Sequence, residues 1–111
     1  MARQLLTEIY RGALAGVQYS DYQLAKLKAG TALKLVWEKT NAFDPNAIAV
    51  YAGKVKIGYI NKESTHVLHG YRKSNIKLTA KVSAFNNTNP TWSMIAVAIY
   101  CKNKKDINET L

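Results

Sequence analysis

The sequence predicts a mainly β domain, a small barrel of about six strands with two short helices. The chain has 111 residues, enough for one compact domain with a modest core and too few for two. Short runs that alternate apolar and polar residues recur along it, separated by Gly, Pro, Asn and Asp. A barrel is preferred to a sandwich because closing the sheet removes exposed strand edges at this size.

The first three predicted elements are a strand, a helical segment and a second strand. Residues 7–17 mix apolar and polar side chains around two glycines, which is typical of a bent or bulged strand. The segment 20–30 opens with Ser-Asp capping residues and ends with glycine, so it predicts one or two helical turns. Residues 31–39 place Leu, Leu and Trp at alternate positions, which predicts a strand with Trp37 in the core.

A turn, a hairpin and a second helix follow. Residues 41–46 are rich in Asn and Asp and contain a proline, a composition that favours a tight turn. The runs 47–51 and 54–60 predict two strands joined by a short Ala-Gly link. Residues 63–69 lie between a serine cap and a terminating glycine, which predicts a second short helix.

The last two predicted strands complete the domain. Residues 74–85 alternate Ile, Leu, Ala and Val with Lys, Thr, Lys and Ser, the clearest strand pattern in the chain. Residues 92–101 are almost continuously apolar, which indicates burial on both sides. We therefore expect one domain over residues 1–102. Residues 103–111 lose the apolar periodicity and are expected to form a frayed tail.

The charge of the chain favours a polyanionic partner. Sixteen Lys and Arg residues against seven Asp and Glu leave a formal net charge of +9, which favours nucleic acid first and anionic lipid second. The apolar run 94–101 is far shorter than the ~20 residues of a transmembrane helix, and residues 1–10 lack an export signal. The single Cys101 suits a reducing compartment and apolar packing. A soluble cytoplasmic protein is expected.

The sequence contains no pattern of a catalytic or metal site. A phosphate-binding G-x-x-x-x-G-K-[ST] loop is absent. His66 and His69 lie three apart on the second predicted helix, but no cysteine or acid accompanies them at ligand spacing, so we expect them to face solvent. The acidic residues are scattered and no nucleophile elbow is present. We therefore expect a binding module that is not an enzyme and uses no cofactor or metal.

Three stretches of the chain resemble the HIRAN domain family. They are "GVQY" at 16–19, "LKLVWEKTNAFDPNAIAV" at 33–50 and "KIGYINKEST" at 56–65, and the resemblance covers about residues 8–100. Its most specific part is N-x-[FY]-D-x-N-A-I-x-V followed by I-G-Y-I. The resemblance implies a six-stranded barrel related to OB and SH3-like folds with two helices. Members occur in helicase-like DNA repair remodellers and as stand-alone bacterial and phage proteins, and the best-understood ones bind single-stranded DNA at a free 3′ end.

The resemblance also implies a DNA-binding pocket. Its residues in this chain are Gln18, Tyr19, Phe43, Asp44, Lys62 and Trp92. Two of them depart from the end-binding pattern: Gln18 stands where those members carry arginine, and Phe43 where they carry tyrosine. Gln18 forms hydrogen bonds but brings no charge to a phosphate. Phe43 stacks on a base but donates no phenolic hydrogen bond.

Each of these residues has an expected role and a structural alternative. Asp44 repels bridging phosphates but accepts a hydrogen bond from a terminal hydroxyl, which would favour a 3′-OH over a 3′-phosphate. Tyr19, Phe43 and Trp92 would stack on bases, and Lys62 would bind a phosphate. Alternatively, Asp44 caps a tight turn as aspartate does before any proline, and the aromatic residues pack at the core or its rim.

The leading interpretation is a non-enzymatic module that binds single-stranded DNA, at its free 3′-OH end, in replication, repair or recombination, with a helicase, nuclease or other repair protein as partner. The alternative is a protein-interaction or scaffold barrel whose basic face docks an acidic partner. RNA remains open as a ligand, and a nuclease is the weakest interpretation.

Seven cations on outward positions or loops either protect strand edges or follow a nucleic-acid backbone. They are Lys34, Lys54, Lys56, Arg72, Lys73, Lys77 and Lys81.

Overall fold

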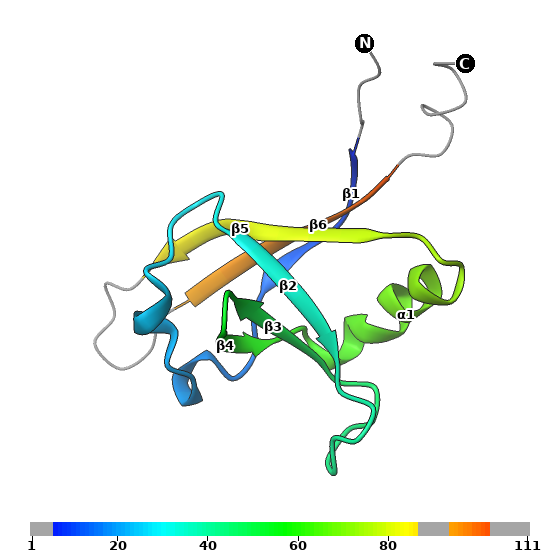
Figure 1. Cartoon of the computed structure of the whole chain (residues 1–111), viewed down its shortest axis with the longest axis horizontal. Helices are drawn as coiled ribbons and strands as arrows, with labels where there is room; N and C mark the ends of the chain where they lie inside the picture. Colours follow the sequence, from blue (N-terminus) through cyan, green and yellow to red (C-terminus); the bar gives the residue numbers. More distant parts are fainter. Residues whose placement is uncertain (1–5, 87–93, 103–111) are drawn as a thin grey trace.

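Six antiparallel strands form one sheet in the computed structural model, which describes residues 6–86 and 94–102 (Figure 1). The order across the sheet is β1-β6-β5-β2-β3-β4. The strands are β1 (Leu6–Ala13), β2 (Ala32–Trp37), β3 (Ile48–Ala52), β4 (Val55–Tyr59), β5 (Leu78–Asn86) and β6 (Met94–Lys102). All six lie within or next to the segments that the alternation predicted. Trp92 and the tail at 103–111 lie outside the described residues.

The helical segments differ from the prediction in type and length. They are the 3-10 helices η1 (Val17–Tyr19), η2 (Tyr22–Ala25) and η3 (Lys62–Ser64) and the α-helix α1 (Thr65–Lys73). The helix predicted within 20–30 is therefore the single 3-10 turn η2, which Lys26 ends with a left-handed φ of 50°, and η1 lies just before that range. The second helix runs through Gly70 and continues to Lys73, with Leu68 packed in the core and His69 and Arg72 in contact with Trp37; a left-handed φ of 60° at Asn75 follows its end.

The sheet is not closed into a barrel. Its edge strands, β1 and β4, are joined in the described part of the chain by one bridge between Ala15 and Tyr59, just beyond the end of β1. Each of these residues donates its N–H to the other's carbonyl at 2.9 Å. The chain then turns at Gly16, whose φ is 73°, so the pairing stops there. The mainly β class and the six strands are confirmed, and barrel closure is not.

The sheet also splits between its two halves. β2 pairs with β5 at Ala32↔Lys81 and Leu33↔Ala80, and its next four residues, 34–37, pair with β3 instead. β5 and β6 remain paired along their whole length. The two halves therefore diverge, and α1 lies at the open end between them (Figure 1).

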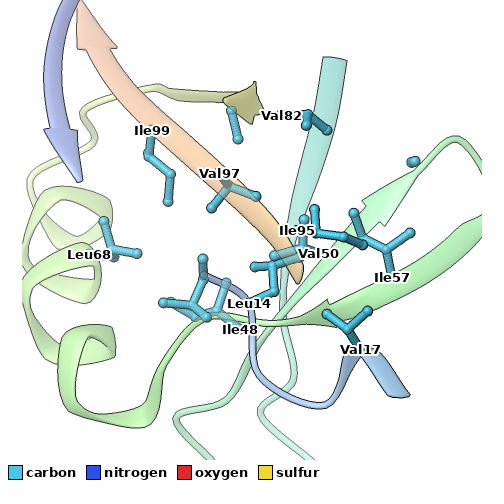
Figure 2. Close-up of a cluster of buried hydrophobic side chains, with 13 residues drawn as sticks. Leu14, Val17, Ile48, Val50, Ile57, Leu68, Val82, Ile95, Val97 and Ile99 are labelled. Atoms are coloured by element: carbon cyan, nitrogen blue, oxygen red, sulfur yellow. The ribbon is translucent and has the colours of Figure 1, made fainter. Parts of the chain in front are cut away.

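The hydrophobic core lies where the two halves of the sheet and α1 meet. Figure 2 shows apolar side chains from β3, β4, β5, β6, α1 and the segment after β1 pointing toward one another. Eight of these side chains are the largest that are fully buried: Ile48, Val50, Ile57, Leu68, Val82, Ile95, Val97 and Ile99. Each contributes about 1.5–3 kcal/mol relative to exposure. No helix in the described ranges is long and apolar enough to cross a membrane.

Candidate functional site

The turn between β2 and β3 projects from the body of the sheet (Figure 1) and is held by side chains. Asn41 Oδ1 accepts the backbone N–H groups of Phe43 at 2.8 Å and Asp44 at 3.0 Å. Asp44 Oδ1 in turn accepts the N–H of Asn46 at 2.9 Å. The Asn and Asp that predicted a turn therefore form it by satisfying its amides.

Phe43 is placed in solvent by this turn. Its side chain is 98% exposed, the highest value among the large apolar residues described. Both the amide of Phe43 and that of the next residue are fixed by Asn41, so the exposure comes from a defined backbone. Because the phenyl ring is exposed, it contributes no hydrophobic stabilisation to the folded state, and its face is accessible for stacking on a ligand.

Asp44 serves the turn with one of its carboxylate oxygens. Oδ1 bonds Asn46, which confirms the structural alternative for this residue. Within the part of the chain that the structure describes, no residue donates to Oδ2. The side chain is half-buried beside the exposed Phe43. Asp44 can therefore cap the turn and accept one more hydrogen bond at the same time.

Glu38 connects the turn to β4. Its Oε1 accepts hydrogen bonds from Tyr59 Oη at 2.9 Å and Asn41 Nδ2 at 3.0 Å, and its Oε2 lies 3.0 Å from Lys56 Nζ. Lys56 Nζ also donates to Tyr59 Oη at 3.0 Å. We call Glu38, Asn41, Lys56 and Tyr59 the brace, because they join the base of the turn to the edge strand.

Hydrogen bonds within the brace stabilise the charged forms of Glu38 and Lys56. Burial disfavours the ionised form of Glu38, but the hydrogen bonds from Asn41, Lys56 and Tyr59 outweigh it and lower the pKa of that carboxyl. The hydrogen bond to Tyr59 and the ion pair with Glu38 raise the pKa of Lys56. Both groups are therefore charged at neutral pH, and a lysine expected on an outward position is half-buried and paired instead.

A hollow lies beside the brace, on the side of η1. It has a volume of about 530 Å³, and its lining includes Tyr19, Lys54, Lys56 and Tyr59. Tyr19 is 88% exposed, and its N–H donates to Gly16 O at 3.1 Å. The bridge between Ala15 and Tyr59 places this segment against β4. Lys56 and Tyr59 thus line the hollow, and both also bond Glu38, which in turn bonds Asn41 at the base of the turn.

The predicted site residues fall into three groups. Phe43 and Asp44 share the turn, and Tyr19 lies across the brace from them. Lys62 begins η3, and the hydrogen bond from Ile60 N–H to Ile48 O brings the chain out of the sheet at the end where the turn lies. The side chains of Lys62 and Gln18 are exposed; neither forms a hydrogen bond or ion pair with the described turn, and neither lines the hollow. Trp92 is outside the described residues.

Sequence reasoning missed the brace, although two of its members carried a signal. Asn41 and Tyr59 belong to the N-x-[FY]-D and I-G-Y-I patterns, in which they received no role. Glu38 and Lys56 are polar residues at the end of one strand and inside another, and sequence alone does not show that they meet.

The histidines of α1 and Trp37 also differ from expectation. His66 is exposed, as predicted, but His69 packs on Trp37 with ring centroids 4.9 Å apart and donates from Nε2 to Asn46 O at 3.0 Å. Trp37 is half-buried against the core, and the guanidinium of Arg72 lies 4.9 Å from its ring. Within residues 6–86 and 94–102, no three His, Cys, Asp or Glu residues are grouped to hold a metal ion.

Comparison with known proteins agrees with this fold. A crystal structure of a protein from Lactobacillus plantarum is similar with a TM-score of 0.74 at 20% identity, covering 91% of this chain and 99% of that one. The crystal structure of the HIRAN domain of human HLTF is similar with a TM-score of 0.69 at 17% identity, covering 96% and 85%. No curated protein matches the chain significantly. The family model described as "HIRAN domain" matches residues 8–104, nearly the whole chain, and the protein therefore belongs to the HIRAN domain family.

Proposed function

We propose that this protein binds the free 3′-OH end of single-stranded DNA at the turn 41–46. Membership of the HIRAN family, a family of DNA-binding rather than catalytic domains, supports the coarser function of a nucleic-acid-binding module. The net charge of +9 supports it as well, since phosphate contacts dominate affinity for nucleic acids. The end-specific part of the proposal depends on Asp44 and Phe43.

The observation that carries the proposal is the pairing of an exposed phenyl ring with an available carboxylate oxygen on one braced turn. Phe43 offers its ring to a terminal base, a contact worth about 1–3 kcal/mol and tolerant of sequence. Asp44 Oδ2 accepts the hydrogen bond of a terminal 3′-hydroxyl next to that base, whereas a phosphate in the same place brings two negative groups together. Asp44 therefore selects among ends, and other residues supply the attraction.

The remaining predicted residues complete the proposed site. Tyr19 provides a second exposed ring beside the hollow, and Lys54 supplies positive charge there, whereas Lys56 is paired with Glu38 and Asp21 adds a carboxylate. In this proposal Lys62 binds a phosphate of the same strand, and Gln18 and Trp92 keep the roles that the family pattern implies. A module of this kind would act in replication, repair or recombination with a helicase, nuclease or other repair protein that performs the chemistry.

The test is fluorescence anisotropy with matched oligonucleotides. One labelled single strand is prepared with a 3′-OH, with a 3′-phosphate and as a circle, and the three are titrated at two salt concentrations. The proposal requires the 3′-OH strand to bind more tightly than the other two. Asp44→Ala should remove the difference between the 3′-OH and the 3′-phosphate strands. Glu63→Ala, which removes the same charge from an exposed position in η3, should leave it unchanged.

Equal binding of all three strands would reject end recognition. If that binding also weakens steeply with salt, the protein has a basic surface without an end pocket, and the scaffold interpretation with an acidic partner becomes the better one. A strand of the same sequence in RNA shows whether the sugar matters.

A further inference from the structure

A second concave surface lies where the sheet splits between β2 and β5. It has a volume of about 460 Å³, and three cations line it: Lys34 on β2, Arg72 on α1 and Lys77 before β5. None of the described residues that line it is acidic. We call it the basic groove. Its size is that of a ligand site, and neither the predicted DNA-binding residues nor the turn belong to its lining.

The basic groove exists because two strands part. Residues 34–37 of β2 pair only with β3, and Leu78 and Thr79 of β5 pair only with β6. α1 enters the wide end of the split, where His69 and Arg72 pack on Trp37. The groove is therefore formed mainly by β2, β5 and α1, with Ile76 and Lys77 of the α1–β5 connection completing its lining.

Arg72 lies against Trp37 in this groove. Its guanidinium carbon is 4.9 Å from the ring centroid of Trp37, a cation–π contact. The N–H donors lie in the guanidinium plane and stay available for a phosphate. Lys34 and Lys77 are exposed and add two further positive charges.

The basic groove and a hollow beside the turn share one residue. Trp37 lines the groove and also a hollow of about 540 Å³, whose lining includes Lys39, Asn41 and the acidic Glu38. Asn41 is the residue that fixes the amides of Phe43 and Asp44. The two hollows that meet at Trp37 thus place four cations, Lys77, Lys34, Arg72 and Lys39, and one carboxylate, Glu38, between the split in the sheet and the base of the turn.

We infer that the basic groove binds the phosphate backbone of the same strand whose 3′ end lies at the turn. This inference rests on the proposed function. Charge complementarity alone would also admit an acidic polypeptide, but the hollow that shares Trp37 with the groove reaches Asn41 at the base of the turn, which favours the strand whose end lies there. The end of the strand then lies at Phe43, and nucleotides farther from the end place their phosphates along Lys39, Arg72, Lys34 and Lys77.

The test compares a groove variant with a charge-matched control. The groove variant is Lys34→Ala with Lys77→Ala, and the control is Lys26→Ala with Lys28→Ala, two exposed lysines of the η2–β2 connection that do not line the groove. The affinity for 3′-OH and 3′-phosphate strands of about 12 nucleotides is measured from about 50 to about 200 mM salt. Circular dichroism checks that both variants fold.

The inference requires a change in the salt slope of the groove variant alone. Each lost phosphate contact lowers the slope of log K against log salt by about 0.7, so the slope falls by about 1.4. Over the fourfold salt range, wild-type affinity then drops about sevenfold more than that of the groove variant. The preference for 3′-OH over 3′-phosphate should remain in both variants.

Other outcomes separate the two proposals. A preserved 3′-OH preference with equal slopes in all three proteins overturns the basic groove and leaves end recognition standing. A lower slope in the groove variant without any 3′-OH preference supports the groove and rejects end recognition. Absence of binding rejects both. Poly-L-glutamate that binds as tightly as the strand, with the same dependence on Lys34 and Lys77, overturns the nucleic-acid assignment.

Discussion

Two regions of this protein present an exposed aromatic ring, and they are held by different forces. The turn 41–46 displays Phe43, 98% exposed, on a backbone fixed by the side chains of Asn41 and Asp44. The segment 16–19 displays Tyr19, 88% exposed, on a backbone fixed by main-chain hydrogen bonds and the buried Val17. Neither ring is exposed because its backbone lacks structure.

The two regions should therefore be sensitive to different kinds of substitution. The turn depends on side-chain oxygens, so a substitution at one position can remove several hydrogen bonds. The segment 16–19 depends on close backbone approach between Ala15 and β4, so it is sensitive to added bulk on the strand. Ligand binding should require both rings, whereas stability should respond differently to changes in the two regions.

Gly58→Ala should have the largest effect on stability. A Cβ at this buried position would lie 2.9 Å from Ala15 O and 3.1 Å from Leu14 Cβ, and backbone cannot rotate away. Overpacking of this kind costs about 1–3 kcal/mol, and here it also opposes the bridge that positions Tyr19. Urea unfolding measures the loss.

Gly70→Ala is the matched control for this prediction. A Cβ there meets nothing within 4 Å, and alanine replaces glycine inside α1. It should stabilise the protein by up to about 1 kcal/mol. Equal effects of the two substitutions would show that Ala15 and β4 are not closely packed.

Phe43→Ala should weaken DNA binding and leave stability unchanged. Loss of one stacked base costs about 1–3 kcal/mol, or about 5- to 150-fold in Kd by anisotropy. Because the ring is almost fully exposed, the urea midpoint should stay at the wild-type value. Val67→Ala, an exposed apolar residue on α1, should change neither quantity. A destabilised Phe43→Ala protein would mean that the ring packs against the domain.

Asn41→Ala should affect both stability and binding. The substitution removes the Oδ1 atom that accepts two backbone N–H groups of the turn and the Nδ2 group that donates to Glu38. We therefore expect the free energy of unfolding to fall by about 1–2 kcal/mol. Binding should weaken because Phe43 and Asp44 lose their fixed position. Asn46→Ala keeps the backbone N–H that bonds Asp44 and should be nearly neutral. If the Asn41→Ala protein is as stable as wild type and binds DNA with full affinity, the brace does not hold the turn in its binding position.

The smallest expected effect is a pH dependence from Glu38. Its hydrogen bonds lower its pKa in the folded state below the ordinary 4.5, so its stabilising contribution is complete above that value. The contribution is lost as the pH falls through the lower, folded pKa. The stability difference between wild type and Glu38→Gln should therefore shrink on acidification from pH 5 toward pH 2. A difference that stays constant would show that Glu38 is not ionised in the brace.

Local pattern was sufficient to predict the strands and the turn. Alternation along β5 places Ala80 and Val82 in the core, and the Asn and Asp residues of 41–46 form the turn they predicted. The family pattern placed Phe43 and Asp44 on one turn. That Gln18, Tyr19, Phe43, Asp44, Lys62 and Trp92 contact DNA stays a prediction.

Features that depend on tertiary contacts could not be predicted in this way. The alternation of Leu33, Leu35 and Trp37 does not show that β2 changes partner after Leu33, since this depends on where β5 diverges. Lys56 is half-buried only because Glu38 meets it from another strand. His69 is half-buried because its ring packs on that of Trp37. The open sheet and the basic groove follow from such contacts.

The central claim is that the turn and the segment 16–19, joined by the brace, form one surface for a DNA end. The most direct test is an NMR titration of the ¹⁵N-labelled protein with a short 3′-OH single strand, monitored through backbone amide shifts. The account predicts saturable shifts at Phe43, Asp44 and Tyr19 together, weaker with a 3′-phosphate strand. Shifts confined to residues of β1 and β6, with the amides of the turn unchanged, would contradict it.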